Sequence, residues 1–166
     1  MFIDRNRELA ALEREYARDQ ASFVVGYGRR RVGKTALISR FIADKPAIYY
    51  LATEESEPQN RAVFQSLVAD YLHDDLLRDA LLPRWEPVFT AIARSAAEAR
   101  SNGRRLVIVL DEFQYLGLAN PEFPSVFQRI WDTILAKANV MVILCGSLVS
   151  MMESQVLSYD SPLYGR

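Results

Sequence analysis

The sequence predicts an α/β domain in three layers, with helices covering both faces of a mostly parallel sheet. Four short runs are apolar at successive positions rather than at alternate ones, which is the pattern of strands buried on both faces. These runs are Phe23–Tyr27, Ala47–Thr53, Leu106–Leu110 and Val140–Cys145. Helical segments separate them, and a crossover helix is the usual connection between parallel strands. The sequence contains no repeat, low-complexity tract or linker, so we expect residues 1–166 to form one domain.

Apolar residues at helical spacing predict the segments between the strands. They place helices within 4–18, 33–43, 62–72, 88–96, 124–138 and 148–154. Asp4 or Asn6 is expected to cap the first of these helices. Pro87 suits the start of the helix that contains 88–96, and Asn102-Gly103 suits its end.

The composition excludes several classes of protein. Lys and Arg number 20 against 21 Asp and Glu, so no bulk basic field favours nucleic acid. The single cysteine, Cys145, excludes an internal disulfide framework. No apolar run approaches the roughly 20 residues of a membrane span, and the charged N-terminal segment is unlike a signal peptide. We therefore expect a cytoplasmic protein without a membrane partner.

A few distinctive side chains are expected to have structural roles. Trp85 and Trp131 are interpreted as core or interface anchors, and Cys145 as part of the core of the fourth strand. His73 is expected at the surface, since one histidine cannot build a zinc site. Tyr49-Tyr50 alternate across a strand, so at most one of the two faces any given partner.

The segment from Gly28 to Thr35 fits the pattern G-x-x-x-x-G-K-[ST] at every fixed position, between a predicted strand and a predicted helix. Glycines let the backbone fold tightly enough to point several N–H groups inward, and the following helix adds its positive N-terminal end. Lys34 is expected to reach the β- and γ-phosphates of a nucleotide, and the Thr35 hydroxyl to bind Mg²⁺. The phosphate-binding residues we expect are Gly28, Arg29, Arg30, Arg31, Val32, Gly33, Lys34, Thr35 and Ala36.

Other interpretations of this segment are less favoured. A glycine-rich turn with an incidental lysine would give the same letters without a ligand. The side chains of Arg29, Arg30 and Arg31 are expected to be solvated or paired on the outer side of the loop, because the net charge of the chain is near zero.

Asp111 and Glu112 follow the third apolar run, where the strand is expected to end. An aspartate at this place holds Mg²⁺ directly or through water. The adjacent glutamate polarises the water that attacks the γ-phosphate. A carboxylate pair capping a solvated loop is the alternative. The sequence lacks an N-K-x-D motif, which argues against GTP as the substrate.

Ser147 follows the fourth predicted strand and would face the cleft outside the carboxyl ends of the sheet. There its hydroxyl is expected to bond the γ-phosphate or the attacking water. Capping of the next helix is an ordinary alternative for a serine at this position.

In these motifs the chain resembles the archaeal-type ATPases of the AAA+ and STAND group. The resemblance implies Lys34 and Thr35 as Walker A residues, Asp111 and Glu112 as Walker B residues, and Ser147 as sensor 1. It also implies that Phe2 and Ile3 lie near the adenine ring. The matching segments are Phe2–Leu9, Gly28–Thr35, Leu110–Leu116, Cys145–Met152 and Pro162–Arg166.

The resemblance further implies a sheet order of 5-1-4-3-2 and elements that this sequence lacks. Such proteins continue beyond the segment at Gly165-Arg166 into a fifth core strand, a small helical lid and often a C-terminal effector domain. We therefore expect 1–166 to be an incomplete core domain. The strand at 23–27 would then have an apolar edge, which proteins normally cover. We expect a partner molecule, a second copy of the chain or the C-terminal segment to cover it.

The function that these observations favour is binding and hydrolysis of ATP with Mg²⁺, driving a conformational change in attached domains or partners. Glu112, Lys34 and Ser147 are the expected catalytic residues, and Thr35 and Asp111 the metal ligands. The main alternative is a switch that binds ATP or ADP with negligible hydrolysis. A small-molecule kinase would need an acceptor pocket that the sequence does not identify. A nucleic-acid partner rests on family analogy alone.

Overall fold

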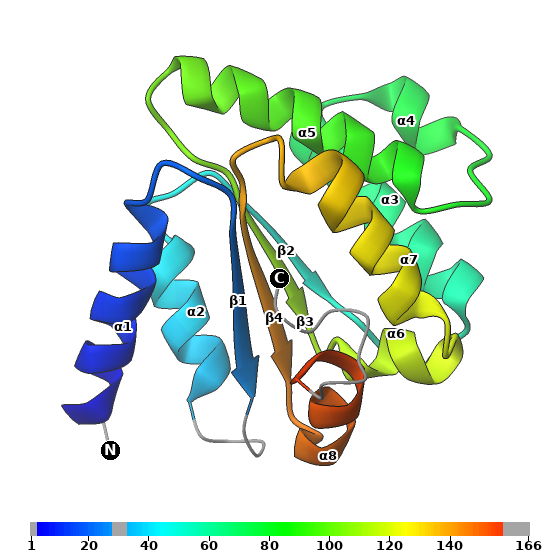
Figure 1. The fold of residues 1–166 in the computed structure, drawn as a ribbon. Helices are drawn as coiled ribbons and strands as arrows, with labels where there is room; N and C mark the ends of the chain where they lie inside the picture. Colours follow the sequence, from blue (N-terminus) through cyan, green and yellow to red (C-terminus); the bar gives the residue numbers. More distant parts are fainter. Residues whose placement is uncertain (1–2, 28–32, 158–166) are drawn as a thin grey trace.

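Four parallel strands form the centre of the molecule (Figure 1). The computed structural model describes residues 3–27 and 33–157. Within them the strands are β1 (Ser22–Tyr27), β2 (Ala47–Leu51), β3 (Val107–Asp111) and β4 (Met141–Gly146). Their order is β1-β4-β3-β2, and every neighbouring pair is parallel. The expected arrangement of these four strands is confirmed.

Helices connect the strands and follow the last of them. The first half of the chain contains α1 (Ile3–Tyr16), α2 (Lys34–Ile42), α3 (Glu57–Leu72), α4 (Asp75–Asp79) and α5 (Glu86–Ser101). The second half contains α6 (Gln114–Ala119), α7 (Phe123–Ile130), η1 (Trp131–Leu135), α8 (Val149–Met152) and η2 (Glu153–Leu157), of which η1 and η2 are π-helical turns. None of these described helices combines the length and apolarity needed to cross a membrane.

Most helix ends follow the local chemistry. Ser56 and Gln59 form a reciprocal capping box at the start of α3. Pro87 lies in the first turn of α5, and Gly103 has a φ of 73° directly after the C-cap Asn102, so both expectations for this helix are confirmed. The expected caps of α1 are wrong, because Ile3 is already helical and both Asp4 and Asn6 lie inside the helix. The short helices α4 and α6 were not expected, since five or six residues show no clear period.

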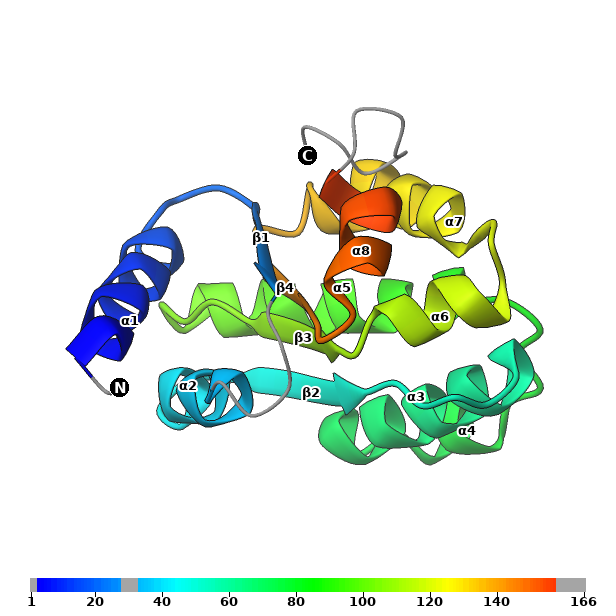
Figure 2. The same cartoon turned by 90° about the horizontal axis from the view of Figure 1, so that it is seen from below.

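Each face of the sheet carries its own core. α1 and α2 cover one face, and α3, α5, α6 and α7 cover the other (Figure 2). Successive strand residues point to opposite faces. Under α1 and α2 lie Val107, Val109, Met141, Ile143 and Cys145. Under the other helices lie Ile108, Leu110, Val142 and Leu144. Because both sets are buried, β3 and β4 are apolar at almost every position.

The distinctive side chains take the structural places expected of them. Trp85 and Trp131 are both buried in the larger core, and Trp131 packs edge-on against Phe23 of β1. Cys145 is buried under α1 and α2, and burial raises the pKa of its thiol to about 12. His73 is exposed and ends α3 in the left-handed region, with a φ of 53°.

β1 lies at one edge of the sheet within the described residues, and its partner β4 pairs with it from Ser22 to Tyr27. Phe23, Val24 and Val25 are half-buried, since the helices cover their side chains in part. The C-terminal segment expected to cover this edge includes residues 158–166, which lie outside the described residues. Coverage of the edge by that segment or by a partner stays a prediction.

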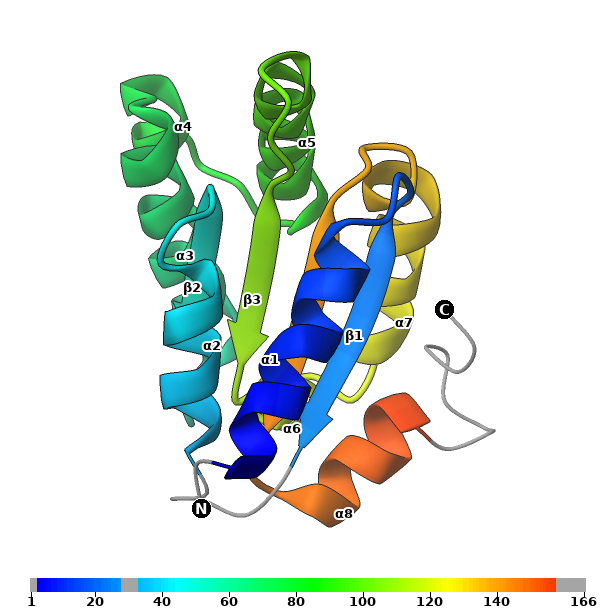
Figure 3. The ribbon, with the colours of Figure 1, turned by 90° about the vertical axis from the view of Figure 1, so that its left-hand side faces the viewer.

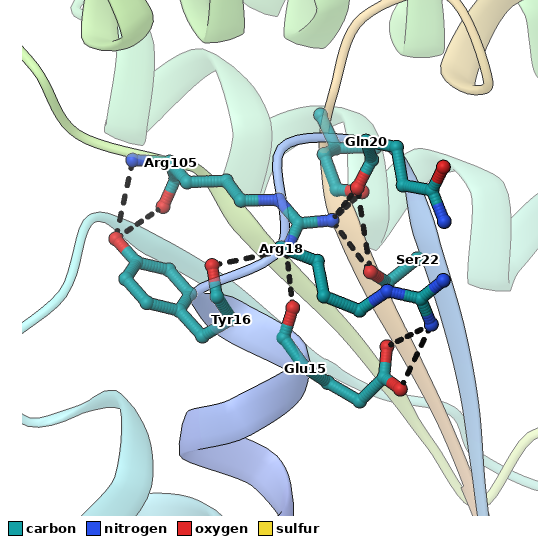
Figure 4. A network of polar contacts seen from close by, with 7 residues as sticks. Glu15, Tyr16, Arg18, Gln20, Ser22 and Arg105 are labelled. Carbon is teal, nitrogen blue, oxygen red and sulfur yellow. Dashed lines mark hydrogen bonds and ion pairs between the residues drawn. The ribbon is translucent and has the colours of Figure 1, made fainter.

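Arg105 ties α1 to the sheet at the end away from the carboxyl ends of the strands (Figure 4). The residue is only 7% exposed. Its guanidinium donates to the carbonyl oxygens of Glu15, Tyr16, Gln20, Asn139 and Val140 and to the hydroxyl of Ser22. The Tyr16 hydroxyl donates to the Arg105 carbonyl at 2.8 Å and accepts from its N–H at 3.1 Å. Burial lowers the pKa of Arg105, and the ring of oxygen acceptors replaces water around its charge.

Arg105→Lys is expected to destabilise the domain by about 2–4 kcal/mol, because an ammonium group has three donors and cannot match the planar fork that reaches these acceptors. The unmatched carbonyls would stay buried. The free energy of unfolding in urea measures this effect. Arg104→Lys is the matched control, since Arg104 is exposed and donates to one carbonyl, that of Asp44. Equal stability of the two variants would contradict the role given to Arg105.

Candidate functional site

The carboxyl ends of the four parallel strands lie at one edge of the sheet (Figure 3). Polar residues follow the apolar strands at this edge. β1 leads through residues 28–32 toward α2, β3 ends at Asp111, and β4 ends at Gly146. In open parallel sheets this edge is where ligands bind. Lys34, Thr35, Glu112 and Ser147 all line one cleft here, of about 720 Å³.

The N-terminus of α2 opens into this cleft. Its cap residue, Gly33, is in the left-handed region with a φ of 79°, and no side chain caps the helix. The first backbone hydrogen bond runs from the Leu37 N–H to the Gly33 carbonyl, so the amides of Lys34, Thr35 and Ala36 have no acceptor within the helix. The first turn contains no acidic residue. These features suit an anion, because free N–H groups and the helix dipole both favour negative charge.

Lys34 reaches from α2 across the edge of the sheet to β4. Its Nζ donates to the carbonyl oxygen of Gly146 at 2.7 Å. The ammonium is therefore held at the end of β4, one residue before Ser147. A Cβ at position 146 would overlap the side chains of Met152 and Gln114, so a larger residue there would force these side chains to move.

Asp111 ends β3 as a buried carboxylate, 4% exposed. Its Oδ1 accepts the N–H of Glu112 at 2.8 Å, and its Oδ2 accepts the hydroxyl of Tyr49. No cationic side chain of residues 3–27 and 33–157 forms an ion pair with it. Carboxylate and hydroxyl oxygens, such as those of Asp111 and of Thr35 in the cleft, are the donors that a hard cation such as Mg²⁺ prefers.

Glu112 has a left-handed backbone, with a φ of 55° that side-chain-bearing residues rarely adopt. Such strain persists where the surroundings enforce it, often at functional sites. The Oε2 of Glu112 accepts from the Ser147 hydroxyl at 2.7 Å and from the Gln114 amide at 2.5 Å. The Phe113 N–H also bonds to the carbonyl of Cys145 at 2.9 Å. These contacts fasten the end of β3 to the end of β4 and aim the Glu112 side chain along the cleft.

Tyr49 of β2 contacts the buried carboxylate at the end of β3. Its hydroxyl donates to Oδ2 of Asp111. Burial, followed by the nearby carboxylate of Asp111, raises the pKa of Tyr49 well above its ordinary value. The phenol is thus a proton donor throughout the neutral range.

Asn60 shapes the turn that borders the cleft after β2. The residue is fully buried, and its Nδ2 donates to the carbonyl oxygens of Thr53, Glu55 and Ser56 at 3.1–3.2 Å. Its Oδ1 accepts the Thr53 N–H at 3.1 Å and the hydroxyl of Tyr50. The strand ends at Leu51, two residues before Thr53, where the sequence predicted its end. After the strand, Ala52, Thr53 and Glu54 line the cleft.

Sequence reasoning named five residues that the structure brings together here: Lys34, Thr35, Asp111, Glu112 and Ser147. Gly33 and Ala36 also line the cleft. The predicted residues Gly28, Arg29, Arg30, Arg31 and Val32 lie outside the described residues, as does Phe2. The sequence interpretation missed Asn60, Gln114 and the role of Tyr49. Strand alternation does place Tyr49 and Tyr50 on opposite faces, and each of them proves to have a different partner.

A second cavity, of about 340 Å³, lies between α1, α2 and the sheet. Its lining is mostly apolar and includes Leu12, Val24, Leu37 and Ile38. Lys34 borders both cavities.

The strand order and the helix that begins after β1 define the fold of P-loop NTPases. The chain belongs to the family of ATPase domains found predominantly in Archaea, which matches residues 2–166. A relative from Methanocaldococcus jannaschii, itself an uncharacterized protein, is 37% identical over 169 residues, covering 100% of this chain and 34% of its own length. The chain thus spans about a third of that relative.

Solved structures share the fold at lower identity. The Walker-type ATPase of Pyrococcus abyssi is 24% identical, with a TM-score of 0.69 over 98% of this chain and 51% of its own. The ORC2 protein of Aeropyrum pernix, solved as ADPNP and ADP complexes, is 19% identical, with a TM-score of 0.62 over 92% of this chain and 44% of its own. The chain spans about half of each of these proteins.

Asn60→Ala is expected to cost about 2–4 kcal/mol in the free energy of unfolding, because it leaves several buried partners of the turn unsatisfied. Tyr50→Phe removes one of these contacts and should cost less. Denaturation in urea measures both. An Asn60→Ala variant as stable as the wild type would show that the turn does not depend on this side chain.

Proposed function

We propose that this domain binds ATP together with Mg²⁺ and hydrolyses it at the cleft beside α2. The main support is that four features lie together at the carboxyl end of the sheet. They are the N-terminus of α2, Lys34, the Asp111-Glu112 pair and Ser147. Membership in a family of ATPase domains supports the same chemistry.

The phosphates are proposed to lie against the first turn of α2. The amides of Lys34, Thr35 and Ala36 would donate to phosphate oxygens, and residues 28–33 are the other residues proposed to bind the phosphates. Lys34 would exchange the Gly146 carbonyl for the β- and γ-phosphates. Thr35 and Asp111 are the residues proposed to hold Mg²⁺, which when bound neutralises charge on the β- and γ-phosphate oxygens.

Glu112 is proposed as the general base. In the hydrolytic step a water oxygen bonds to the γ-phosphorus, the bond between that phosphorus and the bridging oxygen of ADP breaks, and the water proton passes to Glu112. Ser147 and Gln114 both contact Oε2, so Oε1 is the atom proposed to receive the proton. Their contacts orient the carboxylate before a nucleotide enters. Ser147 would then signal the state of the site to α8 through the end of β4.

A nucleotide switch is the second candidate, and a specific observation favours it. Lys34 bonds to a carbonyl and Glu112 to a serine and an amide, so both would exchange partners before acting on ATP. Slow exchange would give a domain that binds nucleotide and hydrolyses little. In either case, because the chain spans about a third of a longer relative, we propose that the nucleotide state is passed to attached domains or partners.

Lys34→Ala is expected to weaken ATP binding by tenfold or more, which corresponds to about 1.4 kcal/mol or more of lost interaction with the phosphates. Titration calorimetry with ATP and with ADP in the presence of Mg²⁺ measures this change. Lys137→Ala is the matched control, since Lys137 is exposed and remote from the cleft. Equal affinities for the two variants would contradict the proposed phosphate site.

Glu112→Gln is expected to lower phosphate release by about a hundredfold or more while ATP still binds, because the amide cannot accept the water proton. Single-turnover phosphate release measures it, with Glu122→Gln as the control at an exposed glutamate outside the cleft. If the wild type binds ATP and releases no phosphate, the switch is the correct function. Undiminished release by Glu112→Gln would exclude Glu112 as the base.

A further inference from the structure

Tyr49 of β2 lies on the face of the sheet that α1 and α2 cover. In the register of the two strands, Tyr49 pairs with Val109 and Leu51 pairs with Asp111. Tyr49, Val109 and Asp111 therefore share one face, two positions apart along the strands. The phenol spans that interval, so its hydroxyl meets the Asp111 carboxylate at the end of β3.

The hydrogen bond between these two groups has a fixed direction. An ionised carboxylate only accepts, so the Tyr49 proton is donated to Oδ2 of Asp111. The phenol hydroxyl therefore holds one oxygen of the carboxylate in place.

Asp111 is fixed from two sides. Its Oδ1 takes the Glu112 N–H, and its Oδ2 takes the Tyr49 hydroxyl. Each carboxylate oxygen has two acceptor sites, so both oxygens can still receive a cation or a cation-bound water. The two donors therefore set the plane of the carboxylate without using up its capacity.

We propose that Tyr49 is a positioning residue for magnesium: its hydroxyl orients the Asp111 carboxylate and so sets how tightly Mg²⁺ binds with the nucleotide. This inference rests on the proposed function, in which Asp111 and Thr35 hold the ion. Groups that orient metal ligands in this way typically contribute about 10- to 100-fold to metal affinity. Among the hydrogen bonds of the described residues, the Tyr49 hydroxyl forms none with the first amides of α2 or with the side chain of Lys34.

The test is the magnesium dependence of nucleotide binding in Tyr49→Phe, which keeps the ring and removes the hydroxyl. Binding of a fluorescent N-methylanthraniloyl derivative of ATP is titrated with Mg²⁺ and compared with binding in EDTA. We expect the Mg²⁺ midpoint to rise by about tenfold or more. We expect the affinity in EDTA to stay within about twofold, because the phosphate contacts of α2 remain.

Tyr50→Phe is the matched control. It makes the same change one residue along the same strand, and the hydroxyl lost there bonds to Asn60 on the opposite face. We expect its Mg²⁺ midpoint to equal that of the wild type, even though the turn after β2 is weakened. A general loss of stability would instead raise the Mg²⁺ midpoint of both variants. The melting temperature of each variant measures how much stability it has lost.

Several outcomes overturn the inference. An unchanged or lower Mg²⁺ midpoint in Tyr49→Phe would show that the hydroxyl does not position the ligands. An equal rise in Tyr50→Phe would assign the effect to stability. A wild type that binds the nucleotide equally well in Mg²⁺ and EDTA, or not at all, would overturn the proposed function together with this inference.

Discussion

Helices bury the parallel strands on both faces, and this burial determines where polar groups can lie in the molecule. β3 and β4 are apolar along almost their whole length because helices cover them on two sides. Polar groups on these strands are therefore confined to the ends, and parallel alignment brings all the carboxyl ends to one edge. Asp111, Gly146 and the start of α2 meet there as a consequence.

The two ends of the sheet differ in how fully their charged and polar groups are paired. At the amino end, Arg105 is surrounded by carbonyl and hydroxyl oxygens that satisfy it completely, which suits a permanent structural tie. At the carboxyl end, Asp111 has hydrogen bonds but no described cation, and the first amides of α2 have no acceptor within the helix. The Asp111 carboxylate suits a cation, and the first amides of α2 suit an anion. The proposed ligand, a magnesium nucleotide, carries both.

The sequence was sufficient to predict the four strands and the five residues that meet at the edge, because those features leave periodic or motif-based signals. The order of the strands was implied by the resemblance to archaeal-type ATPases. Asn60 and Gln114 leave none: each is a single buried amide whose partners are fixed by packing between distant segments. Tyr49 could be assigned a face by alternation, but its contact with Asp111 depends on the register of β2 against β3. The helix α4 was too short to show a period.

In the proposed function, the phosphates of a nucleotide bind at the N-terminus of α2 between Lys34 and Glu112. The most direct test follows backbone amide shifts in ¹H–¹⁵N spectra as Mg²⁺ and ADP are added. We expect the largest shifts at Lys34, Thr35 and Ala36, smaller shifts at Glu112 and none around Arg105. Shifts confined to the apolar cavity between α1 and α2, or no shifts at millimolar ADP, would contradict it.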